Sequence, residues 1–400
     1  MIQPTLFSKN SEIKIFKLNV FLITVTGILM CGCAAANNTE PIAQQVINTE
    51  YQTLVLETVM DNLEHPWSVA FLPDGRYLIT ERPGRLLIID GNTRTPVQGL
   101  PDIHAVGQGG LLDVVLHPDF EENNYIYLTY SKPDGNGNTA LALCRAKLEN
   151  TRLIDLEDIF IQNHYSGPGR HYGSRLAWMN DGSLLMSIGD RGAEPLRAQD
   201  RDDHAGTVLR LNDDGTVPDD NPFASSETGS QYVYSYGHRN IQGLVVDLES
   251  GMVWATDHGP RGGDLLVKIL AGHNYGWPIV TQGLDYRTQE PYPFTQSRRK
   301  EGITPHTYDF GPTLAPSGLT LITTAQFRRW QGNLLAGGLR SERIRRLVLQ
   351  THDEFVEVIH DEELLLGLIG RIRDVREGTD GSVYILTDLP DGAFYRVKPR

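Results

Sequence analysis

The chain is poor in cysteine, has no excess of positive charge, and shows no pattern that predicts long helices. Three of its 400 residues are cysteine, and Cys31 and Cys33 lie near the N-terminus, so Cys144 leaves the mature domain without an internal disulfide. The formal net charge of -14 argues against nucleic acid as a partner, because binding phosphates requires a basic surface. What remains is an ordinary globular composition, 40% hydrophobic and 22% charged, with enough apolar residues for a large core.

Long apolar runs are also scarce, and the run at residues 20–30 is too short for a comfortable membrane span. It follows several lysines and precedes small residues, which is typical of an export signal. We therefore expect residues 1–36 to be a signal segment and residues 37–50 to be a flexible tether. The sequence around Cys33 resembles a bacterial lipoprotein box, so lipidation of Cys33 and simple signal cleavage are both open. Either would export the protein to the periplasm, and lipidation would anchor it to the outer membrane.

Glycine and proline, by contrast, are abundant. The 40 glycines and 22 prolines occupy turn positions, which favours many short strands. Past the tether, the chain repeats an apolar run, a turn containing Asp, Asn or Gly, and a second apolar run. Successive copies begin roughly 45 to 75 residues apart, as expected for four-stranded propeller blades with loop insertions. The six copies are Ser68–Thr80, Leu112–Tyr130, Leu176–Ile188, Leu244–Thr256, Leu319–Ala336 and Ile372–Thr387.

The repeats predict an all-β fold, a six-bladed β-propeller that spans residues 51–400. An early apolar run, Leu54–Val59, would pair with the last blade and close the ring, which removes free sheet edges. The alternative is a β-sandwich or two separate β-domains, but no linker-like change of composition interrupts the chain. In a propeller the loops at one end of the channel converge, so residues far apart in the sequence can form one site.

His171 is the first candidate for chemistry. It lies in a glycine-rich turn directly before an apolar run, a position from which a β-scaffold can present a catalytic base. A lone loop histidine is more often a solvated or capping residue, so its position alone does not show that His171 is catalytic.

A set of arginines at the expected blade edges stands out in an acidic protein. Arg371 and Arg373 alternate along a strand, so both guanidinium groups share one face. Two like charges on one face are costly unless an anion lies between them, and arginine suits carboxylates and phosphates. The alternative is that each arginine pairs with a nearby acid, such as Asp374 or Glu342. The other polar residues at blade edges are Gln108, Gln199, Arg239, Asn240 and Arg340.

Seven motifs follow one another along the chain from about residue 54 to residue 399: GQGGLLDVVLHPDF, RHYGSRL, GTVLRLNDDGTVPDDNPF, YGHRNIQGL, DHGPRGGD, NYGWP and GRIRDV. In this order they resemble the soluble sugar dehydrogenases that depend on pyrroloquinoline quinone (PQQ), in particular the aldose sugar dehydrogenase branch of the glucose/sorbosone dehydrogenase family. The resemblance implies a six-bladed propeller that binds PQQ and calcium in a cleft above the channel. It also implies oxidation of an aldose sugar at C1 to a lactone, with electrons passed on to an external acceptor.

The same resemblance implies a role for each candidate residue. His171 would be the base that takes the proton of the anomeric hydroxyl, while the C1 hydride passes to PQQ. The three carboxylates of PQQ would account for the arginines. The residues that would contact the cofactor are Gln108, Gln199, Arg239, Asn240, Tyr286, Tyr308, Arg340, Arg371 and Arg373.

The chain departs from the family pattern in two places near the expected site. Backbone carbonyls of Gly259, Pro260 and Tyr275 would be calcium ligands, but Leu265 stands where the family commonly has an acid, and leucine cannot ligate a hard cation. Beside the histidine, Arg170 replaces an acid of the glucose dehydrogenase branch, and a neighbouring cation lowers a histidine pKa.

Two other classes of function compete with the dehydrogenase. One is a calcium-dependent lactonase, which would need several acidic ligands converging at the channel. The other is a non-catalytic propeller that binds carbohydrate or protein, similar to the domain of animal Hedgehog-interacting proteins. The presence of both the histidine and the arginines favours the dehydrogenase.

Overall fold

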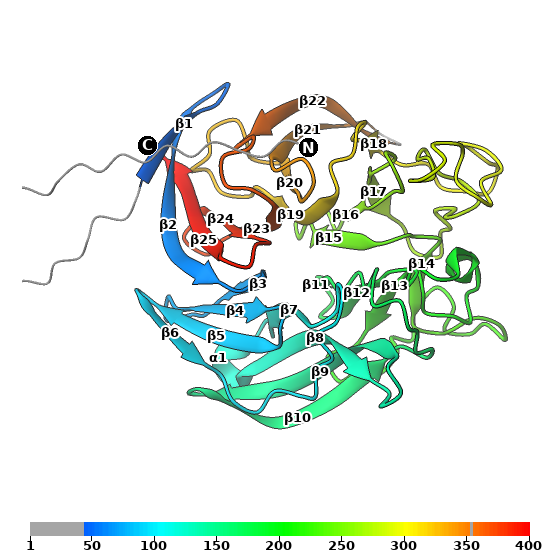
Figure 1. Ribbon diagram of the computed structural model, residues 1–400, viewed down its shortest axis with the longest axis horizontal. Coiled ribbons are helices and arrows are strands. Elements are labelled where there is room, and N and C mark those ends of the chain that lie inside the picture. The colour runs from blue at the N-terminus through cyan, green and yellow to red at the C-terminus, as the bar shows by residue number, and fades with distance from the viewer. Residues whose placement is uncertain (1–43, 353–354) are drawn as a thin grey trace, which may run out of the picture. The chain divides into compact units, whose positions relative to one another are not determined.

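Each predicted repeat forms the two inner strands of one antiparallel sheet, and six such sheets stand around a central channel (Figure 1). The computed structural model describes residues 44–352 and 355–400 and confirms the six-bladed β-propeller. The first strand of every blade lies innermost, where it contacts the first strands of the two neighbouring blades.

The strands of the first three blades follow one another along the chain. Blade one contains β3 (Pro66–Phe71), β4 (Tyr77–Glu81), β5 (Arg85–Asp90) and β6 (Thr93–Pro96). Blade two contains β7 (Leu111–Leu116), β8 (Tyr125–Pro133), β9 (Thr139–Glu149) and β10 (Arg152–Ile161). Blade three contains β11 (Leu176–Trp178), β12 (Leu184–Ile188), β13 (Thr207–Leu211) and β14 (Val233–Tyr236).

The next two blades repeat this order, and the sixth combines both ends of the described chain. Blade four contains β15 (Ile241–Val246), β16 (Val253–Asp257), β17 (Leu265–Ile269) and β18 (Tyr308–Asp309). Blade five contains β19 (Pro316–Leu321), β20 (Leu334–Gly338), β21 (Ile344–Thr351) and β22 (Val356–Leu364). Blade six contains β23 (Ile372–Glu377), β24 (Val383–Thr387), β25 (Gly392–Pro399), β2 (Thr53–Leu63) and β1 (Gln44–Asn48).

The ring closes as the sequence predicts, because β2 pairs with β25, with Leu54 opposite Pro399 and Leu56 opposite Val397. Part of the expected tether at 37–50 is wrong, since residues 44–48 form β1 on the outer edge of β2. Val46 and Ile47 take strand geometry there because the edge of β2 offers unpaired backbone groups. The signal segment 1–36, with Cys33, and the start of the tether lie outside the described residues.

Helices are almost absent from the described chain. There is one four-residue α-helix, α1 (Phe120–Asn123), and one 3₁₀ turn, η1 (Pro195–Gln199). None of the described helices is long and apolar enough to cross a membrane.

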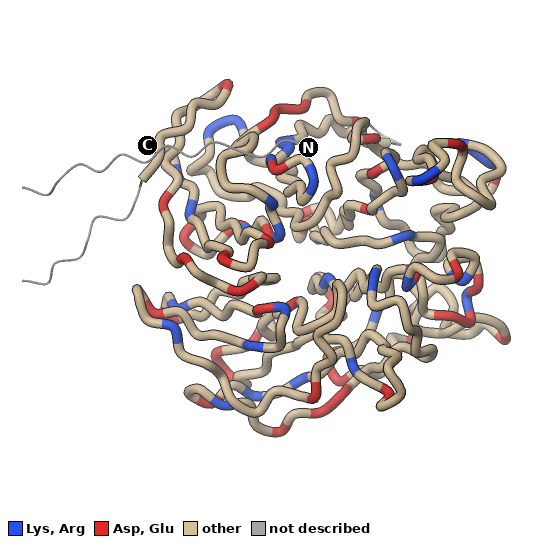
Figure 2. Tube along the Cα trace, viewed as in Figure 1, with Lys and Arg blue, Asp and Glu red and all other residues tan. Residues whose placement is uncertain are grey.

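Charge is distributed unevenly between the rim and the middle of the ring. Acidic segments are spread over the periphery, whereas several basic segments lie close to the centre (Figure 2). One of the central residues is Arg175, which is buried just before β11. It donates to the backbone oxygens of Gln242 (2.6 Å) and Arg373 (3.1 Å) and pairs with Asp374 (2.9 Å). Arg175 therefore joins inner strands of blades three, four and six across the channel.

Candidate functional site

A cavity of about 830 Å³ lies at the end of the channel where the inner strands begin. Its walls come from the loops that enter β3, β7, β11, β15, β19 and β23, so all six blades contribute. The connection between β17 and β18, residues 270–307, adds Asp285, Tyr286, Arg287 and Tyr292. Residues scattered over more than 300 positions thus meet in one place, as the propeller geometry predicts.

Most of the predicted site residues line this cavity. The structure brings together Gln108, His171, Arg239, Asn240, Tyr286, Arg371 and Arg373. Tyr286 is 57% exposed, so its ring stands at the entrance of the cavity.

Three predicted cofactor contacts do not line the cavity, and the structure gives each of them another place. The amide of Gln199 donates to the backbone oxygen of Trp277 (2.7 Å) and to Asn274 (3.1 Å). The Tyr308 hydroxyl donates to Asp361 (2.6 Å) between the outer strands β18 and β22. Arg340 is exposed, although its neighbour Leu339 does line the cavity. The family resemblance implied cofactor contacts for these three residues, but it did not determine the direction of their side chains.

His171 is held by a buried carboxylate that the sequence analysis missed. Its Nδ1–H donates to Asp190 Oδ1 over 2.6 Å, and its backbone N–H donates to Gln108 Oε1 over 2.8 Å. The backbone of His171 is left-handed, with φ of 53°, a conformation that is costly for a non-glycine residue and occurs often at functional sites. Asp190 is 1% exposed, and its other oxygen accepts the indole N–H of Trp277 (2.8 Å).

The environment keeps the imidazole neutral and the carboxylate ionised. Burial lowers the pKa of His171, and the positive charge of Arg239 lowers it further, while Asp190 opposes both effects. Burial alone would raise the pKa of Asp190, but the hydrogen bond from His171, the positive charge of Arg239 and the hydrogen bond from Trp277 outweigh it, so that pKa is lowered. With the proton on Nδ1, the lone pair of His171 Nε2 is left for a reacting group in the cavity. His171 therefore has a carboxylate partner in Asp190, although its neighbour in the sequence is Arg170.

Arg371 and Arg373 share one carboxylate. Two neighbouring arginines require an anion between them, and here an acid of the protein itself takes that place. Asp388 lies 2.6 Å from Arg373 and 3.3 Å from Arg371, and it also accepts from His65 Nδ1 (3.0 Å). Burial would raise the pKa of Asp388, but Arg373, His65 and Arg371 together lower it well below its ordinary value. The alternative considered from the sequence, pairing with a nearby acid such as Asp374 or Glu342, is wrong about the acid for these two arginines. One carboxylate between two guanidinium groups leaves net positive charge.

Two of the arginines keep hydrogen-bonding capacity that the protein does not use. Arg239 and Arg373 are 8% and 7% exposed, and the Nε of each has no partner within the described residues. Buried donors without a partner are costly, and a bound carboxylate is the group that best satisfies arginine. The arginines that line the cavity therefore favour a ligand that carries carboxylates.

A calcium ion fits this region poorly. Gly259 and Tyr275 line a different, second cavity, and Pro260 lines neither cavity. The oxygens of nearby Asp264 already accept the backbone N–H groups of Gly259 (3.0 Å), Leu314 (2.8 Å) and Ala315 (2.8 Å). Among the described residues, no group of three or more His, Cys, Asp or Glu side chains could hold a metal ion.

Asp190 and Asp388 had a signal in the sequence that the repeat analysis did not use. In five of the six blades an acid stands at the end of the second strand or within two residues of it. These acids are Glu81, Asp134, Asp190, Asp257 and Asp388. Comparing the repeats position by position would have marked them.

The chain is similar to known proteins over most of its length. The family model described as "Glucose / Sorbosone dehydrogenase" matches residues 63–396. The aldose sugar dehydrogenase YliI of Escherichia coli is 36% identical over 87% of this chain and 94% of its own length. The crystal structure of the soluble aldose sugar dehydrogenase from Escherichia coli in the apo-form has a TM-score of 0.82, 35% identity, and covers 87% of this chain and 100% of that one. The PQQ-bound aldose sugar dehydrogenase of Streptomyces coelicolor has a TM-score of 0.69, 25% identity, and covers 90% and 99%.

Proposed function

The chain belongs to the glucose/sorbosone dehydrogenase family, and on this premise we propose that it oxidises aldose sugars at C1 to lactones with bound PQQ. The observation that carries the proposal is the pair formed by His171 and Asp190, 2.6 Å apart, at the wall of a cavity that Arg239, Arg371 and Arg373 also line. A binding propeller would need the arginines or the histidine, but not a buried acid that sets the histidine's tautomer.

The arginine side of the cavity would hold the cofactor. PQQ is planar and carries three carboxylates, which match the three arginines that line the cavity, Arg239, Arg371 and Arg373. Asn240 and Gln108 present their amide N–H groups, because their oxygens already accept backbone N–H groups of Gly173 and His171. A relative of this chain is known in a PQQ-bound form. When bound, PQQ supplies the hydride acceptor that amino-acid side chains lack.

His171 would move the proton. Its Nε2 accepts the proton of the anomeric hydroxyl as hydride leaves C1, and Asp190 stabilises the imidazolium that forms. A positioned base of this kind contributes roughly a hundredfold to ten-thousandfold to the rate. Trp277 keeps Asp190 in place from the opposite side through the bond of its indole N–H.

The proposal also covers the electron acceptor and the cellular location of the protein. An external acceptor would take the two electrons from the reduced cofactor, and the protein would work in the periplasm. The export signal in residues 1–36 supports that location, and lipidated Cys33 would provide a membrane anchor.

The test is reconstitution of the purified protein with PQQ, with and without calcium, while glucose and other aldoses reduce a dye. We expect PQQ to bind and aldoses to reduce the dye, and the variant His171→Gln to bind PQQ without turnover. Activity with PQQ alone would agree with the poor fit of calcium near Gly259. If PQQ does not bind at all, the dehydrogenase is wrong and a binding propeller is the better account.

A further inference from the structure

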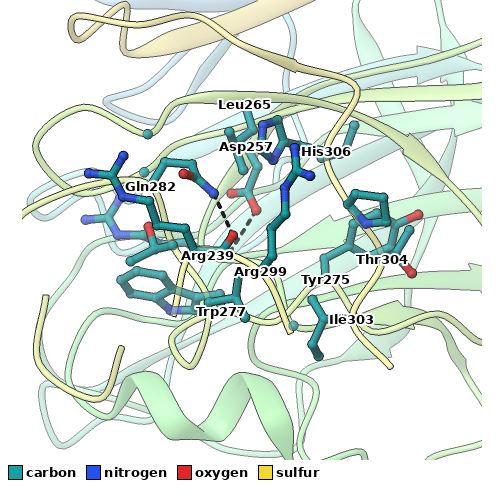
Figure 3. A pocket seen from close by; sticks show the side chains of 18 of the residues that line it. Arg239, Asp257, Leu265, Tyr275, Trp277, Gln282, Arg299, Ile303, Thr304 and His306 are labelled. Atoms are coloured by element: carbon teal, nitrogen blue, oxygen red, sulfur yellow. Dashed lines mark hydrogen bonds between the residues drawn. The ribbon is translucent and has the colours of Figure 1, made fainter. Parts of the chain in front are cut away.

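A second cavity, of about 390 Å³, lies in blade four behind the wall that Arg239 and His258 share with the first cavity (Figure 3). It is built from the end of β16, from β17, and from two parts of the connection 270–307. The same connection sends Tyr286 and Tyr292 to the first cavity, so one long insertion forms part of both.

The interior of the second cavity is apolar. Its lining includes Leu265, Val267, Tyr275, Trp277 and Ile303, and Figure 3 shows Leu265 and Ile303 at different ends of it. Leu265 is the residue that replaces an acid of the family pattern, so carbon stands here instead of a potential cation ligand. Apolar walls of this kind gain free energy by covering the hydrophobic body of a ligand.

The mouth of the second cavity is basic. Arg298, Arg299 and Lys300 line it one after another and are exposed. None of the three forms an ion pair with a carboxylate in the part of the chain that the structure describes, and Lys300 donates to the amide oxygen of Gln296 (2.8 Å) instead. The Arg299 side chain runs along the cavity toward His306 in Figure 3, and its charge adds to burial in lowering the pKa of His306.

Two acids also line the second cavity, but they do not neutralise its mouth. Asp257 accepts the backbone N–H groups of Arg239 (3.1 Å) and Asn240 (2.7 Å) at the inner end. Glu301 is exposed beside the three basic residues. The mouth therefore keeps a net positive charge above an apolar interior.

We propose that the second cavity binds a small organic anion with a planar apolar body and one carboxylate. The body would lie against Leu265, Val267 and Trp277, and the carboxylate would face the guanidinium groups of Arg298 and Arg299. A molecule with several carboxylates fits the first cavity better, because there the charges surround the ligand instead of lining one end. This inference does not depend on the reaction at His171.

The probe is 2-naphthoate, and its matched neutral partner is 2-naphthalenemethanol, which has the same ring system without the charge. Calorimetric titration of the full protein, saturated with PQQ so that the first cavity is filled, measures both. We expect naphthoate to bind at least about tenfold more tightly than the alcohol, since charge-assisted hydrogen bonds contribute that much. The affinity should fall as salt concentration rises, because the basic mouth is exposed.

Three protein variants test whether naphthoate binds in the second cavity. Arg298→Gln with Arg299→Gln should weaken naphthoate about tenfold or more. The control, Arg328→Gln with Arg329→Gln, removes the same charge from an exposed Arg-Arg pair in blade five that lines neither cavity, and should leave binding unchanged. Ile303→Trp fills the cavity and should abolish binding.

Equal weakening by both double variants would mean a general effect of net charge and would overturn the proposal. Equal affinity for the acid and the alcohol would also overturn it, as would loss of naphthoate binding when PQQ is added. If PQQ itself does not bind, the proposed function fails, but the comparison of the two double variants and Ile303→Trp still decides this inference.

Discussion

Replacing Asp190 by asparagine tests the core of the site, because it removes one charge and keeps the shape. Asp190 accepts from His171 Nδ1 (2.6 Å), from Trp277 Nε1 (2.8 Å) and from the backbone of Gly192 (2.8 Å). An amide at this position can donate to Nδ1, which would put the imidazole proton on Nε2 and leave no base toward the cavity. We therefore expect kcat to fall by about a hundredfold to ten-thousandfold.

The pH profile makes this prediction sharper. His171 works in its neutral form, so activity is lost as the pH falls through its pKa, which burial and Arg239 already lower. Asp190 is the group that raises that pKa, through a charge-assisted hydrogen bond worth about 1.5 to 3 kcal/mol. Its loss should move the acid limb of the residual kcat/KM down by about one to two pH units.

The assay is steady-state dye reduction by the PQQ-loaded protein from acid to neutral pH. The matched control is Asp285→Asn, which changes another carboxylate at the same cavity that has no contact with His171. We expect this control to keep kcat and the acid limb of the wild type. Melting curves of both variants show whether they fold. A folded Asp190→Asn protein with wild-type kcat and an unshifted acid limb would refute the role of Asp190.

Three further substitutions test other parts of the structure. His171→Gln should reduce turnover at least about a hundredfold while PQQ titration gives a nearly unchanged Kd, because the base does not hold the cofactor; normal turnover would remove His171 from the mechanism. Arg373→Gln should weaken PQQ about tenfold to a hundredfold by fluorescence titration, whereas Arg340→Gln, outside the cavity, should have little effect; the reverse order would contradict the site. Phe394→Ala should cost about 3 to 5 kcal/mol in the free energy of unfolding, measured by denaturant titration, because this ring is fully buried where blade six closes the ring; a loss below about 1 kcal/mol would contradict that packing.

The fold was predictable because its signals are local and repeated. All six pairs of inner strands lie where an apolar run, a turn and a second apolar run alternate, and Leu54–Val59 closes the ring as expected. The strand at residues 44–48 was missed because its sequence is polar and it forms only against an edge that the tertiary structure provides.

Most residues of the site could be predicted from the sequence, but the hydrogen-bonded and ion pairs that they form could not. His171, Arg371 and Arg373 meet at one cavity, and their acidic partners Asp190 and Asp388 each follow the second strand of the same blade, too far along the chain for a short motif to connect them. Side-chain direction was equally hidden, since the resemblance implied cofactor contacts for Gln199 and Tyr308, but both turn to hydrogen-bond partners away from the cavity. Such pairings depend on how neighbouring blades face one another.

The ring can close only after β25 has been made, because β25 is the strand that pairs with β2. During synthesis β2 leaves the ribosome long before its partner β25, so β2 waits with an open edge. Contacts between such distant residues form late and slow the folding of the whole domain. A chain that stops before Gly392 would keep two unpaired strand edges, on β2 and β24, which invite pairing with other chains. Premature termination should therefore give aggregation and degradation instead of a smaller working propeller.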